Sequence, residues 1–184
     1  MAFDRKQSKL VFHPLYLLFS IIMWVLVVLW LIVIFSLSSE TGDASALRSQ
    51  AFVAKFSGGP AFFTNEYLVR KTAHIVEFLL LSVLTYIAMV ATKHIQSDVN
   101  WNESKLIQLK SDNEVYIAFA LWITTLSAVA DEYHQIFVPG REASLFDVGL
   151  DLAGAFVLML IIRIVVSIHV YIKDKKEPIE MQLS

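Results

Sequence analysis

The sequence predicts an all-α, polytopic membrane protein with four transmembrane helices and one short interfacial amphipathic helix. Of its 184 residues, 57% are apolar and 17% are charged, and the mean hydropathy is +0.61. A soluble domain usually carries about 25% charged residues. The apolar residues gather in four segments, each near the ~20 residues that a helix needs to cross the hydrocarbon core of a bilayer. We expect residues 1–184 to form a single membrane domain.

The first and clearest span covers residues 15–37, which are apolar or aromatic except for Ser20 and Ser36. It follows the basic segment 5–9, an arrangement that also begins a secretory signal peptide. The apolar run is longer than the ~7–15 residues of a signal-peptide core, and no convincing cleavage site follows it. We therefore expect a retained membrane anchor.

Between this span and the next, residues 38–63 mix polar and apolar side chains. The apolar ones recur at helical spacing: Leu47, Ala51, Phe52, Val53 and Phe56. This pattern predicts a short amphipathic helix at the membrane interface, ended by the Ser-Gly-Gly-Pro sequence at 57–60.

The second span covers residues 65–92, with Thr64 or Asn65 as the N-cap and Glu66 in the first turn. Residues 93–114 then form a polar connector with no strong period. The second half of the span is purely apolar, whereas its first half carries charged residues. The charge therefore lies at one end of this helix.

The third span covers residues 115–138 and ends at the Pro-Gly pair that follows it. The fourth covers residues 144–172 and begins with Ser144 and Asp147 at capping-box spacing, with Asp in place of Glu. The short connection predicts an antiparallel helical hairpin. Residues 173–184 would form a polar tail.

The distribution of Lys and Arg predicts the orientation, because these residues accumulate on cytoplasmic flanks of transmembrane helices. With the N-terminus inside, nine fall on inner flanks and five on outer flanks. The inner residues are Arg5, Lys6, Lys9, Lys93, Lys105, Lys110, Lys173, Lys175 and Lys176, and the outer ones are Arg48, Lys55, Arg70, Lys71 and Arg141. Both termini are therefore predicted to be cytoplasmic.

The composition also excludes several functional classes. A net charge of -2, without Lys/Arg clusters interleaved with aromatic residues, argues against nucleic acid as a partner. There is no cysteine, which excludes disulfides, thiolate metal sites and a cysteine nucleophile. The lipid bilayer is the partner that the composition predicts, whereas it gives no indication of an oligomeric state.

The most informative segment is Asp131-Glu132-Tyr133-His134-Gln135, at the end of an apolar span. Each carboxylate at bilayer depth costs roughly 2.5–3.5 kcal/mol, and such groups face a bundle interior or an aqueous cavity. Since residues three or four apart share a helix face, three polar stripes can be drawn at the outer ends of the helices. The stripes are Arg70, His74 and Glu77; Thr124, Ser127, Asp131 and either His134 or Gln135; and Asp147, Asp151 and Gly154. We expect them to meet in one extracytoplasmic pocket where His74, Glu77, Asp131 and Asp151 converge.

This cluster has three alternative interpretations: a metal site, acid–base catalysis and a structural role. His74 with Glu77, and Asp131 with His134, are i, i+3 pairs that could each offer two metal ligands. These pairs resemble the paired Glu-x-x-His helices of di-iron bundles only loosely. Clustered carboxylates beside a histidine also suit acid–base catalysis. The third alternative is structural: Asp147 would only cap its helix, Arg141 would pair with Glu142 or Asp147, and Asp131 with His134 would fix helix registry. In this alternative Arg70 and Lys71 would snorkel to lipid head groups, and His74 would donate a hydrogen bond to another helix.

Three sequence blocks resemble the VanZ-like family of bacterial membrane proteins, named for an accessory protein in resistance to the glycopeptide teicoplanin. The blocks are Phe35-Ser36 through Ser45, Arg70-Lys71-Thr72-Ala73-His74-Ile75-Val76-Glu77, and Asp131 through Arg141 followed by Asp147, Asp151 and Gly154. The resemblance covers residues 35–156 and departs from the family pattern at Glu40, where a neutral residue is expected. It implies a four-helix protein of the bacterial cytoplasmic (inner) membrane with a role in glycopeptide susceptibility. It implies no reaction.

Two functional hypotheses and one structural alternative follow. In the first, the pocket binds a lipid head group or cell-wall precursor through Arg70, Lys71, His74 and Arg141, supported by Gln135, Asp147 and Asp151. In the second, Glu77, Asp131, Glu132 and His134 catalyse hydrolysis or transfer on such a lipid, with water as the nucleophile because no Ser or Thr is suitably placed. In the third, the protein is a structural accessory subunit. Cofactor and metal use stay open.

Overall fold

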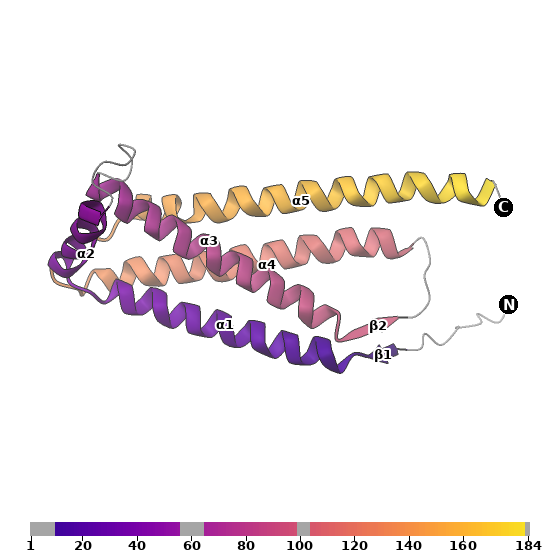
Figure 1. Ribbon diagram of the computed structural model, residues 1–184, viewed down its shortest axis with the longest axis horizontal. Helices are drawn as coiled ribbons and strands as arrows, with labels where there is room; N and C mark the ends of the chain where they lie inside the picture. The colour runs from indigo at the N-terminus through magenta and orange to yellow at the C-terminus, as the bar shows by residue number, and fades with distance from the viewer. Residues whose placement is uncertain (1–9, 56–64, 99–103, 183–184) are drawn as a thin grey trace.

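The computed structural model describes residues 10–55, 65–98 and 104–182 (Figure 1). The elements are β1 (Leu10–Phe12), α1 (Pro14–Ser38), α2 (Gly42–Lys55), α3 (Glu66–Lys93), β2 (Gln96–Asp98), α4 (Ser104–Gln135) and α5 (Leu145–Gln182). The basic segment 5–9, Phe56, residues 57–60 and Thr64 lie outside the described residues.

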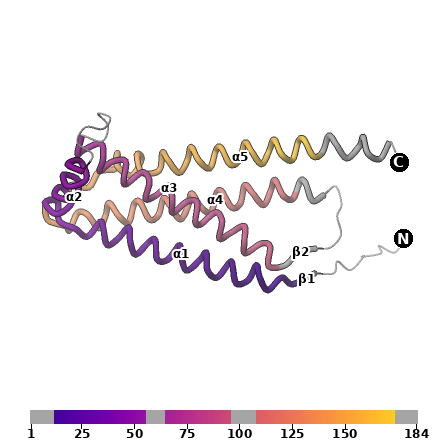
Figure 2. Tube along the Cα trace, viewed as in Figure 1, coloured from indigo at the N-terminus to yellow at the C-terminus, as the bar shows by residue number. Residues whose placement is uncertain are grey.

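Among the described residues, four helices are long and apolar enough to cross a membrane, which confirms the predicted all-α, multi-pass fold. The spans are Pro14–Ser38, Glu66–Lys93, Gln108–Gln135 and Leu145–Lys173. They run lengthwise through the molecule, while α2 lies across one end and the β1–β2 ribbon lies near the other (Figures 1 and 2). The predicted amphipathic helix therefore exists and closes one end of the bundle.

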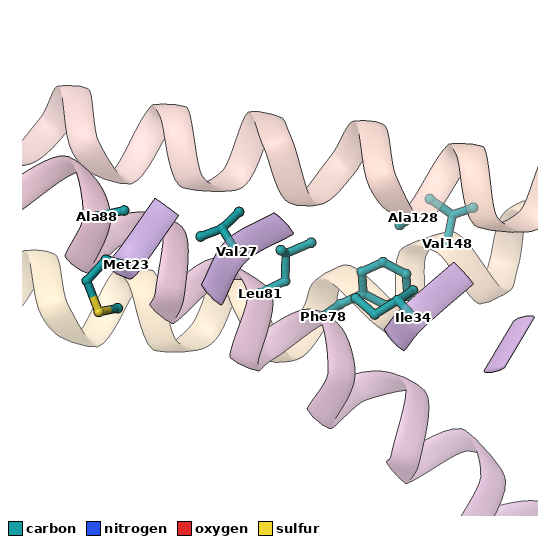
Figure 3. Close-up of a cluster of buried hydrophobic side chains, with 8 residues drawn as sticks. All are labelled: Met23, Val27, Ile34, Phe78, Leu81, Ala88, Ala128 and Val148. Carbon is teal, nitrogen blue, oxygen red and sulfur yellow. The ribbon is translucent and has the colours of Figure 1, made fainter. Parts of the chain in front are cut away.

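The core forms where α3 packs between α1, α4 and α5. Ile34, Phe78 and Leu81 are at most 1% exposed, and the small side chains of Ala88 and Ala128 leave room for close helix approach (Figure 3). Most large apolar side chains on the outer faces of α1 and α5 are exposed, as a lipid-facing surface requires. The bundle thus buries α3 and presents α1 and α5 to the bilayer.

The polar connector between the second and third spans is partly helical, which corrects the prediction. α4 begins at Ser104 instead of near residue 115, because its polar side chains find partners on neighbouring helices. Tyr86 Oη donates to Asn113 Oδ1 at 2.7 Å, and Lys93 Nζ lies 3.2 Å from Asp112 Oδ2. At its other end α4 stops at Gln135, and residues 136–138 form a turn.

The predicted polar tail is also helical where it is described, since α5 continues from residue 172 to Gln182. The Lys and Glu residues of this segment favour the helix, whereas Pro178 within it does not. At the start of α3, Asn65 is the N-cap: its side-chain oxygen accepts hydrogen bonds from the backbone N–H groups of Tyr67 at 3.0 Å and Leu68 at 3.3 Å.

A contact between two glycines joins the start of α2 to the α4–α5 turn, which comprises residues 136–144. The Gly42 backbone N–H donates to the Pro139 carbonyl at 3.0 Å. A Cβ atom on Gly42 would collide with the Gly140 carbonyl oxygen, and Gly140 itself has a φ of 73°. Both positions therefore favour glycine.

The first prediction concerns this contact. Gly42→Ala should lower the free energy of unfolding by roughly 1–3 kcal/mol, because the added methyl group forces two backbones apart. Gly149→Ala is the matched control, since its Cβ would meet nothing within 4 Å, and it should stabilise α5 by roughly 0.5–1 kcal/mol. Thermal unfolding in detergent, followed by circular dichroism, measures both. A Gly42→Ala protein as stable as wild type would contradict the contact.

The second prediction concerns orientation. Reporter enzymes that are active only outside the cytoplasm are fused after Lys175 and after Lys55, at opposite ends of the bundle. The bias in Lys and Arg predicts an active reporter at Lys55 and a silent one at Lys175. The reverse pattern would place α2 on the cytoplasmic side.

Candidate functional site

The predicted polar residues lie at the end of the bundle that α2 covers. They come from the first half of α3, the end of α4, the start of α5 and the α4–α5 turn. These segments are brought together because α4 and α5 form the predicted antiparallel hairpin beside α3. Gly154, placed on the polar stripe by sequence, instead permits close packing: a Cβ there would lie 2.6 Å from Ile75 Cγ2.

Glu132 holds the α4–α5 hairpin together. Its Oε2 accepts a hydrogen bond from the Ser144 backbone N–H at 2.8 Å, while Ser144 Oγ accepts one from the Phe146 N–H at 3.2 Å. In the predicted capping box Asp147 would have taken the Ser144 N–H, so that interpretation is wrong. Asp147 instead forms an ion pair with Lys71 on α3. The start of α5 is thus fixed to both α4 and α3.

Arg141 caps the C-terminus of α1. Its Nε donates to the Glu40 carbonyl at 3.1 Å and its Nη2 donates to the Leu37 carbonyl at 3.3 Å. A cation at this end complements the helix dipole. Burial lowers the pKa of the Arg141 guanidinium, and the positive charge of Arg70 lowers it further. The predicted pairing of Arg141 with Glu142 or Asp147 is not found.

Glu40, the departure from the family pattern, has a partner within the same loop region. Arg48 on α2 lies 2.8 Å from Glu40 Oε2 and donates a second hydrogen bond to Oε1 at 2.9 Å. The ion pair ties α2 to the segment that Arg141 caps. The first loop and the α4–α5 turn therefore form one connected unit.

Asp131 is fully buried and pairs within its own helix. Gln135 Nε2 donates to Asp131 Oδ2 at 2.7 Å. Of His134 and Gln135, the two residues predicted as alternatives on the polar stripe of α4, Gln135 is therefore the one that bonds to Asp131. His134 turns away, and its Nε2 lies 3.0 Å from Ser39 Oγ. Ser38 lies beside Asp131, and both side chains are buried.

Two cavities open at this end of the bundle, whereas the stripes predicted one. The first, a polar cavity of about 620 Å³, lies between α3, α5 and the α4–α5 turn. It is lined by Tyr67, Arg70, Lys71, His74, Glu132, Gln135, Gly140, Arg141, Glu142, Ser144, Phe146, Asp147 and Asp151. All seven residues predicted to bind a ligand are among them, which places those residues without testing their role.

The second, an amphipathic cavity of about 490 Å³, lies between α2 and α3. It is lined by Leu37, Ser45, Arg48, Ser49, Phe52, Val69, Arg70, Thr72, Ala73, His74, Val76, Glu77 and Arg141. Sequence reasoning missed the contribution of α2. Ser45 and Ser49, which lie four residues apart, are the buried positions of that helix. Small side chains at this helical spacing were the signal in the sequence from which the contribution of α2 could have been predicted.

Arg70, His74 and Arg141 line both cavities and form their common wall. His74 Nδ1 is buried without a hydrogen-bond partner in the described structure, and Glu77 Oε2 lies 4.0 Å away. Half-buried Arg70 has no hydrogen bond or ion pair with any described residue, unlike Arg48, Lys71 and Arg141. The wall therefore contains a cation that has no partner among the residues the structure describes.

The four residues predicted for catalysis do not share a cavity. Glu77 lines the amphipathic cavity and Glu132 the polar one, whereas Asp131 and His134 line neither. Asp131 is nevertheless within electrostatic range of both Glu77 and Asp151. These acids therefore lie in one layer of the bundle, as expected, but they do not share one pocket. Across residues 10–55, 65–98 and 104–182, no three His, Asp or Glu side chains are grouped so as to hold a metal ion.

The sequence model of a family described as VanZ/LLP1 matches residues 16–166, which contain α2, α3 and α4, nearly all of α1 and the first part of α5. No curated protein and no solved structure matches the chain.

The third prediction tests the role of Glu132 in the hairpin. Glu132→Ala removes the acceptor of a buried hydrogen bond and should cost roughly 1–3 kcal/mol of stability. Glu132→Gln keeps a carbonyl acceptor and should retain most of it. Glu142→Ala, at an exposed neighbouring acid, is the control. Melting temperatures in detergent provide the measurement, and equal losses in the Ala and Gln variants would show that the charge, not the hydrogen bond, holds the hairpin.

Proposed function

The chain belongs to the VanZ/LLP1 family, and from this premise we propose that it binds a phosphate-bearing, lipid-linked component of the bacterial cell envelope. The ligand would be a phosphate-bearing lipid head group or cell-wall precursor. Its chain would lie in the amphipathic cavity and its head group at the wall between the two cavities. The protein would present this site on the outer face of the cytoplasmic membrane, as the bias in Lys and Arg indicates.

The lining of the amphipathic cavity supports an amphiphile as the ligand. Apolar side chains of α1, α2 and α3 line one part, including Leu37, Phe52 and Val69. Arg70 and Arg141 line it as well, together with Arg48, whose charge is balanced by Glu40. An apolar chain and an anionic group would each meet matching side chains there.

The single observation that carries the proposal is the unpaired guanidinium of Arg70. A cation within a membrane span is costly unless it is paired or hydrated, and such residues commonly mark ligand or ion pathways. Every other arginine that lines the cavities has a partner. Arg70 is therefore the arginine whose guanidinium is available to bind a ligand. The planar guanidinium fork matches phosphate oxygens in bidentate fashion.

Binding of a precursor at the outer membrane face also offers a route to altered glycopeptide susceptibility. Glycopeptides act outside the cell, and a protein that holds an envelope lipid there would change which lipids are available. We include this effect in the proposal as its cellular consequence. The catalytic hypothesis receives less support, because its four residues are distributed over separate environments.

The fourth prediction is that Arg70→Gln weakens binding of phosphate-bearing lipids by roughly 10- to 100-fold, the equivalent of one charge-assisted hydrogen-bonding group. Because no described residue pairs with Arg70, its loss should leave the melting temperature within a few degrees of wild type. Native mass spectrometry of co-purified lipids and titration with phosphatidic acid in a neutral detergent measure the effect.

Arg163→Gln is the matched control, since Arg163 pairs with Glu114 at 2.8 Å and lines neither of the two cavities. Equal binding by wild type and Arg70→Gln would contradict the proposed site. A fall in membrane abundance together with binding in Arg70→Gln would instead favour the structural alternative. In cells, teicoplanin susceptibility should change with Arg70→Gln and not with Arg163→Gln.

A further inference from the structure

We infer that the polar cavity receives a primary ammonium group, so that the ligand is a zwitterionic lipid with a phosphate and an amine in its head group. The inference rests on the proposed phosphate site at Arg70. It adds a second recognition element, Asp151, that the phosphate site does not require. The chemical class is an aminophospholipid, such as one with a phosphoethanolamine head group.

The charged groups of the polar cavity are almost all engaged by the protein itself. Lys71 pairs with Asp147, Glu132 accepts the Ser144 N–H, and Arg141 donates to two carbonyls of the α1 terminus. Glu142 is exposed, where water can solvate it. Among the described residues, the titratable side chains of this cavity that keep an unpartnered group are then Arg70, His74 through its buried Nδ1, and Asp151 through its buried carboxyl oxygen.

Asp151 is built as a recognition group and not as a packing residue. It is 2% exposed, and its Oδ2 has no hydrogen-bond partner among the described residues although it lines a cavity of about 620 Å³. Leaving a buried carboxylate oxygen unpaired costs more than an ordinary buried polar atom. A ligand that donates hydrogen bonds there would remove this cost.

The electrostatic surroundings of Asp151 favour a cation over a neutral donor. Three further carboxylates, Asp131, Glu132 and Asp147, lie within electrostatic range, against the single ammonium of Lys71, which Asp147 already engages. An anion would be repelled from this part of the cavity. A primary ammonium carries one positive charge and three donors, so it would satisfy Asp151 and balance the surrounding charge.

Arg70 and Asp151 do not pair with each other, although both line the same cavity. They lie on different helices, α3 and α5. A head group whose phosphate meets Arg70 and whose amine meets Asp151 would use both groups at once. An anionic lipid without an amine would use only the first.

The test compares lipids that share a phosphate and differ in the amine. Full-length protein in a neutral detergent is titrated with phosphatidylethanolamine, phosphatidylglycerol and an N-acylated phosphatidylethanolamine, in which the amine charge is removed. Wild type should bind phosphatidylethanolamine at least 10-fold more tightly than the other two. This comparison requires no variant, so a variant that fails to fold cannot obscure it.

Asp151→Asn should abolish the preference by weakening phosphatidylethanolamine about 10-fold while leaving phosphatidylglycerol within twofold. Asp112→Asn, at an acid paired with Lys93 and distant from both cavities, is the control and should change neither. Arg70→Gln should weaken both lipids by a similar factor and leave the preference intact.

The outcomes separate the inference from the function on which it rests. If Arg70→Gln changes binding of neither lipid, the proposed phosphate site fails and the inference fails with it. If Arg70→Gln weakens both lipids but wild type shows no preference for the amine, or Asp151→Asn leaves the preference unchanged, the inference alone is overturned. A preference that disappears in Asp151→Asn and persists in Arg70→Gln supports it.

Discussion

The cost of charge at membrane depth determines how the end of the bundle that α2 covers is built. Ionisable groups in a bilayer must be satisfied by the protein, because lipid chains offer no hydrogen bonds. Lys71 therefore meets Asp147, Glu132 meets the Ser144 N–H, and Gln135 meets Asp131. Once these pairs are made, the groups left without partners mark the positions where a ligand would complete the bonding.

The α4–α5 turn is the part of the fold on which both structure and site depend. Gly140 packs against Gly42, Arg141 caps α1, and Ser144 is held by Glu132. One short segment thus fixes the ends of three helices and supplies part of the wall shared by the two cavities. Variants of Gly140, Arg141 or Ser144 would disturb folding and binding together. Arg70 and Asp151 are more informative positions because the fold does not use their charges.

The sequence was sufficient to predict the four spans and the layer in which the polar residues gather. Hydropathy determines which segments cross the bilayer, and helical periodicity determines which residues share a face. The sequence does not predict which partners these side chains find. Residue spacing predicts a cap for Asp147 and a neighbouring acid for Arg141, and it does not decide between His134 and Gln135 on the polar stripe of α4. The partner that a side chain finds depends on distances between helices. Residue spacing within one helix carries no information about those distances. The separation into two cavities depends on α2 and was missed for the same reason.

The unpaired charges also imply how ligand binding would act on the fold. Arg70 lies on α3 and Asp151 on α5, and the close packing of Gly154 against Ile75 already holds these helices together nearby. A ligand that binds both charges would add a further link between α3 and α5 at the end of the bundle that α2 covers. It would also replace two costly unpaired groups by two charge-assisted contacts, and anything that binds only the folded state stabilises it. The site that the fold leaves incomplete is therefore also the point at which a zwitterionic ligand would stabilise the bundle most.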